Sequence, residues 1–242
     1  MRTAVFYKSY AKDVDFLRYS LAARHKFLSG ADETIIVFPD SELSVLRACG
    51  LTREIIVPVQ ESPHQGYLYQ QVSKMYADRH TDCDMLLFMD SDCIACRPFS
   101  PYDLMIDGKP RWLYTSYDKL INLDGTPATP WKPITERAIG RTVNWEFMRC
   151  HPALLPRNAL LEFRAFMAKL HGCELGDYIL KQPNREFSEL NAFGAWAYYY
   201  APCLFSWWNT EEKGVPEPFV RQFWSVNGVT PEIRVEIDSI LK

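Results

Sequence analysis

The stretch Asp84-Met-Leu-Leu-Phe-Met-Asp-Ser-Asp-Cys-Ile-Ala-Cys-Arg-Pro98 joins an apolar run to two carboxylates. Met85–Met89 is typical of a central strand that is buried on both faces. Asp90 and Asp92 follow it directly, and a buried carboxylate without a partner carries a large desolvation cost. We therefore expect both at the edge of a sheet or on a cation. Divalent ions such as Mg²⁺ or Mn²⁺ prefer carboxylate oxygens and often link them to substrate phosphates, which predicts a metal-diphosphate site with Ser91 as a nucleotide contact.

The same three residues have a simpler interpretation, because Asp-Ser-Asp is also good turn chemistry. A second local motif is the C-x-x-C formed by Cys93 and Cys96. No second pair and no nearby histidine completes a zinc set, so we do not assign it to metal. Seven scattered cysteines are an odd number, which favours reduced thiols over a secreted disulfide framework.

Length and composition are typical of a globular protein. The chain has 242 residues, of which 48% are hydrophobic and 24% charged, and we expect a single domain over residues 1–242. Neither a G-x-G-x-x-G nor a P-loop motif occurs, which argues against a dinucleotide oxidoreductase or a P-loop NTPase. No stretch approaches the ~20 apolar residues of a membrane span, and the N-terminus lacks a secretory signal. We expect a cytoplasmic protein with no membrane span.

Strands and helices alternate in the first part of the chain. The predicted strands are Thr3–Tyr7, Thr34–Phe38, Glu54–Val59 and Met85–Met89, and the predicted helices run from about Asp13 to Leu28, from Ser41 to Cys49 and from Tyr67 to Met75. This order predicts an α/β fold with a mostly parallel twisted sheet flanked by helices. Ligands bind at the carboxyl ends of such strands. Lys8, Ser9 and Tyr10 are therefore candidate nucleotide contacts, although they also suit a solvated connection.

The second part of the chain is less regular. Arg111–Tyr114 and Asn144–Arg149 read as strands, and Arg157–Leu170 as an amphipathic scaffold helix. Ser116–Pro133 reads as a long loop, and a loop of this length suggests a lid or an acceptor-binding segment. His151 is a candidate metal or phosphate ligand, although a lone histidine at a strand end is more often an ordinary loop residue.

A helix is predicted to begin at Glu189, capped by Ser188. The helix dipole favours the charged form of a carboxyl group in the first turn. An ionised Glu189 would suit a general base that takes a proton from an acceptor hydroxyl, with Glu186 as a less favoured substitute. The alternative is that Glu189 only complements the helix dipole.

These motifs together resemble the GT-A glycosyltransferases, in which a D-x-D closes a strand of a nucleotide-binding domain and holds the metal on a sugar nucleotide. The order Gln71-x-x-Lys74, apolar strand and D-x-D is similar to that of small bacterial and phage members. The amide and ammonium could reach a base and a phosphate. Ser188-Glu189 through Phe193-Gly194 is similar to their Ser-Glu-x-x-x-(Tyr/Phe)-Gly stretch. Many GT-A enzymes also have a metal-binding histidine near the C-terminus, whereas this chain has none after His171.

The resemblance implies a Mn²⁺- or Mg²⁺-dependent enzyme that moves a sugar from a nucleoside-diphosphate sugar to an acceptor hydroxyl. Residues 1–110 would form the nucleotide-sugar half and residues 111–242 the acceptor side, where Trp207 or Trp208 could stack on a sugar. The alternatives are a nucleotidyltransferase and a non-catalytic carbohydrate-binding protein.

The charge balance bears on the acceptor. With 27 basic and 30 acidic residues and a net charge of -3, we favour a saccharide or other small molecule over duplex DNA. A patch formed by the local basic run could reverse that preference. Its members are Lys132, Arg137, Arg141, Arg149 and Arg157.

Overall fold

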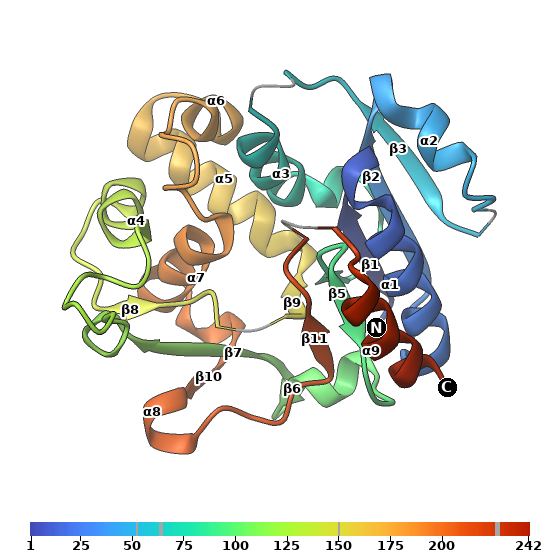
Figure 1. Cartoon of the computed structure of the whole chain (residues 1–242). Helices are drawn as coiled ribbons and strands as arrows, with labels where there is room; N and C mark the ends of the chain where they lie inside the picture. Colours follow the sequence, from blue (N-terminus) through green and yellow to red (C-terminus); the bar gives the residue numbers. More distant parts are fainter. Residues whose placement is uncertain (52, 63–64, 150, 226–227) are drawn as a thin grey trace.

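A five-stranded sheet forms the centre of the computed structural model (Figure 1), which describes residues 1–51, 53–62, 65–149, 151–225 and 228–242. Its order is β3-β2-β1-β4-β9, in which the first four strands are parallel and β9 is antiparallel. The strands are β1 (Thr3–Lys8), β2 (Glu33–Pro39), β3 (Ile55–Val59), β4 (Met85–Phe88) and β9 (Ala153–Pro156). The mostly parallel sheet predicted from the sequence is thus confirmed.

Helices cover both faces of this sheet. The helices among the described residues are α1 (Val14–Phe27), α2 (Leu43–Arg47), α3 (Gly66–Met75), α4 (Trp131–Ile139), α5 (Arg157–His171), α6 (Leu175–Leu180), α7 (Glu189–Tyr200), α8 (Thr210–Lys213) and α9 (Pro231–Leu241), of which α8 lies beside the second sheet described below. Successive side chains of β1 point to opposite faces of the sheet, as the pleat of a strand requires. Val5 and Tyr7 pack with α1, whereas Ala4 and Phe6 pack in the layer that contains α3, α5 and α7.

Shorter strands extend the molecule beside the central sheet. A second sheet has the order β10 (Ser206–Asn209), β7 (Lys109–Ser116) and β6 (Met105–Ile106), and β8 (Trp145–Glu146) also pairs with β7. β11 (Val220–Gln222) pairs antiparallel with β5 (Cys93–Ala95). The second pairing matters for function, because β5 begins immediately after the Asp-Ser-Asp stretch and β11 brings a distant part of the chain beside it.

Helix α7 packs very closely against the second sheet at Gly194. A Cβ atom placed on Gly194 would lie 2.5 Å from Phe147 Cβ and 2.9 Å from Trp112 Nε1. Real Cβ atoms do not approach that closely, so only glycine, which has no side chain, fits at this position. The contact fixes α7, and with it Glu189 at its first turn, against β7 and β8.

Two sequence-based predictions need correction. The expected strand Asn144–Arg149 is reduced to Trp145–Glu146, because β8 pairs only with the last two residues of β7. Ser116–Pro133 is not one irregular loop: Tyr117–Lys119 is a 3-10 turn, Ile121 bridges to Pro127, and α4 starts at Trp131. Within the described residues, none of the helices is long and apolar enough to span a membrane.

Candidate functional site

Polar side chains gather at the carboxyl edge of the central sheet. Lys8 ends β1, and Asp90 and Asp92 follow β4 directly. His151 reaches the same edge from the other direction, because it precedes β9, whose residue Ala153 pairs with Phe88. His151 Nε2 lies 3.3 Å from Asp90 Oδ2. Of the three residues that the sequence suggests as metal ligands, Asp90 and His151 are thus in contact, and Asp92 lies at the same edge.

One buried ammonium group connects two of the carboxylates. Lys74 Nζ on α3 lies 2.7 Å from Asp90 Oδ1 and 2.9 Å from Glu189 Oε1. The side chains of Lys74 and Glu189 are only 2% and 1% exposed, and that of Asp90 is 14% exposed. Gln71, one turn before Lys74, accepts a hydrogen bond from the backbone N–H of Glu189 at 2.9 Å. The Gln71-x-x-Lys74 pair therefore holds the start of α7 onto α3.

This geometry gives both Gln71 and Lys74 protein partners, and the expected contact of Gln71 with a base stays a prediction. Burial alone would raise the pKa of Asp90, but Lys74 and His151 outweigh it and lower that pKa to about 2. Burial alone would lower the pKa of Lys74, but the charges of Asp90 and Glu189 outweigh burial, so that the pKa of Lys74 is raised. Both groups are charged at neutral pH, and the role of Lys74 in binding a substrate phosphate stays a prediction.

Asp92 is held by the segment Gln222–Ser225, whose contact with Asp92 no sequence motif predicts. Its Oδ2 accepts a hydrogen bond from the backbone N–H of Ser225 at 3.0 Å, and its Oδ1 accepts from Gln222 Nε2 at 3.5 Å. Its backbone carbonyl accepts from Phe223 N–H at 3.0 Å. Burial, and then the charge of Asp90, raise the pKa of Asp92.

The site carries more negative than positive charge. Asp13, before α1, is buried, and the pKa of its carboxyl is raised by burial, with the charge of Asp90 acting in the same direction. Lys74 pairs with Asp90 and Glu189, and the charge of Asp90 also acts on Asp13 and Asp92, so that four carboxylates lie near the ammonium groups of Lys74 and Lys12. Asp13 Oδ1 and His151 Nδ1 are buried without a hydrogen-bond partner among the described residues. Surplus carboxylates and free buried ligand atoms fit a hard divalent cation.

A second buried pair lies at the end of β1. Lys8 Nζ contacts Glu61 Oε1 at 2.9 Å and lies 3.7 Å above the centre of the Tyr10 ring, while the Tyr10 hydroxyl donates to the carbonyl of Gly66. Ser9 and Ser91 join the two strand ends through a hydroxyl contact of 2.8 Å. Burial lowers the pKa of Lys8, against the opposing charge of Glu61. All four expected nucleotide contacts of these two loops thus lie at one edge.

Sequence reasoning missed Glu61, Asp13 and the Gln222–Ser225 segment. Glu61 could have been found, since it comes two residues after the end of β3 and so at the same sheet edge as Lys8. Glu186, offered as a substitute base, is exposed. Trp207 is half-buried and packs on Tyr198, whereas Trp208 lies between Arg111 and Lys213, with cation-to-ring distances of 5.5 and 5.2 Å.

Another acidic group lies at the opposite edge of the sheet. Glu33, Asp82 and Cys83 could each offer one ligand atom within 4.8 Å of the others. Arg2 already occupies the space between them, with contacts of 2.8 Å to both carboxylates. We interpret this group as an ion-pair network that fixes the N-terminus to β2 and β4.

The elements that carry the site define a Rossmann-like α/β class with a mostly parallel sheet flanked by helices. The fold is similar to the crystal structure of 4-diphosphocytidyl-2C-methyl-D-erythritol synthase from Anaerococcus prevotii, with a TM-score of 0.50 and 12% identity over 99% of this chain and 95% of that one. By sequence, the chain belongs to a family of unknown function, DUF6492, whose profile matches residues 1–209. No curated protein matches the sequence.

Proposed function

We propose that this protein is a metal-dependent glycosyltransferase that moves a sugar from a nucleoside-diphosphate sugar to an acceptor hydroxyl. The observation that carries the proposal is the position of Asp90 and Asp92 at the carboxyl end of β4, among buried carboxylates that outnumber the nearby cations. Ligands of open α/β sheets bind at this edge. The order of motifs, which resembles that of GT-A enzymes, supports the same reaction.

Asp90, Asp92 and His151 are the residues that would hold Mn²⁺ or Mg²⁺. When bound, the cation would neutralise charge on the departing diphosphate. Lys74 keeps Asp90 ionised at neutral pH and fixes its direction through their 2.7 Å contact. Ser225 and Gln222 orient Asp92 in the same way, and such partners of ligand groups tune metal affinity.

The donor nucleotide would lie along the ends of β1 and β4, against Lys8, Ser9, Tyr10 and Ser91. In this assignment residues 1–110 form the donor half of a single domain and residues 111–242 the acceptor half. Glu189, in the acceptor half, contacts Lys74 of the donor half and is the candidate general base. Its ion pair with Lys74 keeps one carboxylate oxygen occupied at 2.9 Å, so base catalysis would use the other oxygen.

A saccharide or small molecule is the favoured acceptor. The basic residues that could have formed a DNA-binding patch are partly engaged: Arg149 pairs with Glu146 at 3.2 Å, and Arg141 stacks on Tyr199 at 3.9 Å. Lys132 lies 5.6 Å from the centre of the Tyr117 ring. The Arg149 ion pair reduces the charge available to duplex phosphates, whose binding needs several free cations.

A nucleotidyltransferase is the second candidate, because the fold resembles a synthase of a diphosphocytidyl compound. One assay separates the two. The protein is incubated with Mn²⁺ and either a panel of nucleoside-diphosphate sugars or a panel of nucleoside triphosphates with sugar phosphates. Mn²⁺-dependent release of nucleoside diphosphate that is lost in Asp92→Asn supports glycosyl transfer. Pyrophosphate release in the second arm supports nucleotidyl transfer, and saccharide binding without either supports a carbohydrate-binding protein.

A further inference from the structure

The segment Val220–Ser225 crosses the Asp-Ser-Asp stretch and is attached to it. β11 pairs with β5, with Gln222 opposite Cys93, and three hydrogen bonds join the segment to Asp92. Figure 1 shows this part of the chain passing in front of the central sheet. The segment lies beyond residues 1–209, which the family profile matches. It is therefore an addition to the matched region that reaches the candidate metal site.

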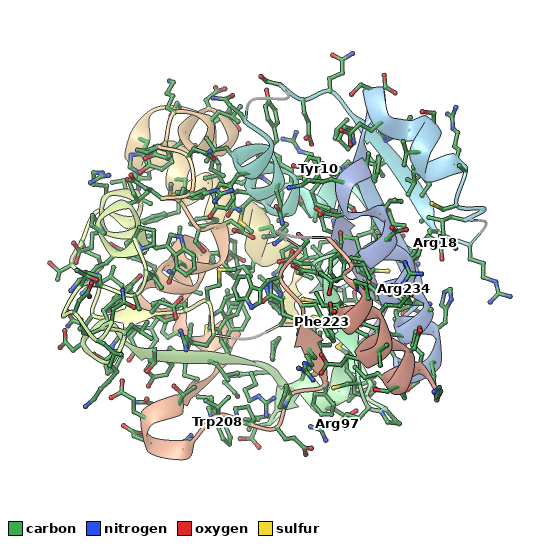
Figure 2. All side chains as sticks on the ribbon, viewed as in Figure 1. Tyr10, Arg18, Arg97, Trp208, Phe223 and Arg234 are labelled. Carbon is green, nitrogen blue, oxygen red and sulfur yellow. The ribbon has the colours of Figure 1, made fainter. Side chains whose placement is uncertain are left out.

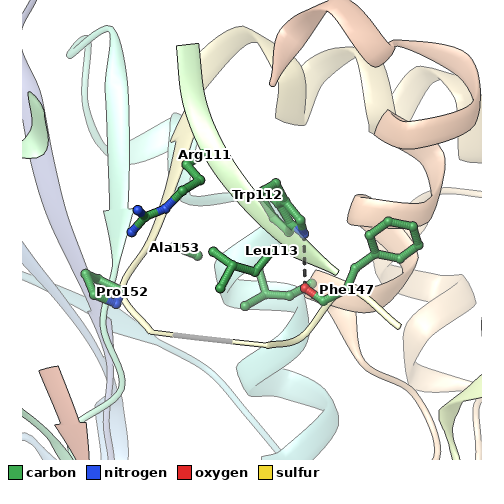
Figure 3. Close-up of a pocket in the computed structure, with 7 residues that line it drawn as sticks. Arg111, Trp112, Leu113, Phe147, Pro152 and Ala153 are labelled. Atoms are coloured by element: carbon green, nitrogen blue, oxygen red, sulfur yellow. Dashed lines mark hydrogen bonds between the residues drawn. The ribbon is translucent and has the colours of Figure 1, made fainter. Parts of the chain in front are cut away.

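Trp224 differs from the other tryptophans of the chain. Its exposed fraction is 70%, whereas the other six are buried or half-buried. Phe223, labelled in Figure 2, is 8% exposed and belongs to the core that contains Tyr7 and Phe16. The φ angle of Trp224 is +50°, a left-handed conformation that is unfavourable for a bulky residue. Such outliers persist only where the surroundings impose them, and they are concentrated at ligand sites.

The hydrogen bonds place Trp224 close to Asp92. The nitrogen of Ser225 lies 3.0 Å from Asp92 Oδ2, and two covalent bonds separate that nitrogen from the Cα of Trp224. The Trp224 Cα is therefore at most about 6 Å from the carboxylate oxygen. An exposed indole carried on a Cα at this distance from the candidate metal site is within reach of the rings that a bound diphosphate would join.

We propose that Trp224 is a donor-binding residue that stacks on a ring of the sugar nucleotide, either the base or the sugar, and this inference rests on the proposed function. Bases and the apolar faces of sugars both offer a flat surface to an indole. The attachment to Asp92 would hold the indole in position before the ligand binds. Trp224 then contributes affinity for the ring, whereas Asp90 and Asp92 serve the diphosphate.

The test compares three Mn²⁺-dependent ligands by isothermal titration calorimetry: pyrophosphate, nucleoside diphosphates and nucleoside-diphosphate sugars. Pyrophosphate offers the charge without a ring. The variants are Trp224→Ala and, as a matched control, Tyr102→Ala, since Tyr102 is an aromatic residue of similar exposure, 63% against 70%, that has no part in the candidate site. We expect Trp224→Ala to weaken a ring-bearing ligand roughly tenfold or more and to leave pyrophosphate unchanged.

The arms also identify the ring. A loss already present with nucleoside diphosphates assigns the stack to the base, and a loss seen only with the sugar nucleotides assigns it to the sugar. Equal affinity of Trp224→Ala and wild type for every ring-bearing ligand overturns the proposal, as does an equal loss for pyrophosphate, which would indicate a disturbed Asp92. If the wild-type protein binds none of the three ligands, the proposed function fails and the stacking role with it.

Discussion

Lys74 and Glu189 form an ion pair of 2.9 Å in which both side chains are almost completely buried. They come from different helices, α3 and α7, that are far apart in sequence. The same ammonium lies 2.7 Å from Asp90, so the candidate base and a candidate metal ligand share one counter-ion. Chemistry at one carboxylate is therefore coupled to the other through Lys74.

Replacement of Lys74 by Met should destabilise the protein strongly. It leaves Asp90 and Glu189 buried without a counter-ion, a loss that typically costs about 3–5 kcal/mol. Lys74→Arg keeps the charge and should recover part of the stability. Urea unfolding followed by circular dichroism measures both, and a loss below about 1 kcal/mol for Lys74→Met would mean that the two carboxylates are not held as this geometry requires.

Asp92→Asn should abolish Mn²⁺-dependent turnover and weaken Mn²⁺ binding while the fold is kept. An amide oxygen can still accept from Ser225 N–H, but it lacks the negative charge that a hard cation prefers. Asp90→Asn should have the same effect on activity together with a loss of stability, since Asp90 is the partner of Lys74. Wild-type turnover by both variants in the presence of a chelator would contradict the metal site.

Glu189→Gln should lower turnover by roughly 10²- to 10⁴-fold, the usual contribution of general base catalysis, with little change in donor affinity. The amide is nearly isosteric and cannot take the proton. Steady-state kinetics with separate kcat and donor KM values distinguish this from a positioning role. If only donor affinity or thermal stability falls, Glu189 acts by holding Lys74, and the base must be another group.

The sheet and the strand-end residues could be predicted from the sequence because their signals are local. Apolar runs identify strands, and the residues after them, Lys8 to Tyr10 and Asp90 to Asp92, must lie at one edge if the strands are parallel. β9 gave no comparable signal, since it has four residues, follows Pro152, ends at Pro156 and runs antiparallel. Helix α4 was hidden because Pro130 and Pro133 at its start resemble a loop.

The partners of the site residues could not be predicted in the same way. Lys74 looked like a surface residue by position, and only the packing of α7 on α3 buries it between two carboxylates. Ser225 is separated from Asp92 by 133 residues, and no sequence pattern near either residue predicts that they are in contact. Spacing along one element is visible in a sequence, whereas contacts between distant elements depend on the whole fold.

Gly194→Ala should destabilise the protein by about 1–3 kcal/mol, the usual cost of overpacking a core. The new methyl group would lie 2.5 Å from Phe147 Cβ unless α7 moves away. Gly176→Ala is the matched control, because Gly176 also lies in a helix and its nearest contact would be an ordinary 3.6 Å to the Tyr76 hydroxyl oxygen. Equal stability of the two variants, measured by thermal unfolding, would contradict the close approach of α7 to β7 and β8.

The pH dependence of stability should carry the signature of Asp90. Its pKa is lowered from 3.8 to about 2 in the folded protein, so between these values the unfolded chain binds more protons and stability rises with pH. The contribution is present in full above the unfolded pKa, is lost as pH falls through about 2, and amounts to about 2 kcal/mol.

The raised pKa of Asp92 acts with the opposite sign: it stabilises the fold below the unfolded pKa of this group, and that stabilisation is lost as pH rises through the folded pKa. Urea unfolding from pH 2 to 6 should therefore show a shallower acid slope for Asp90→Asn than for wild type, and a steeper one for Asp92→Asn. Parallel curves for all three proteins would mean that neither carboxyl titrates as its surroundings require.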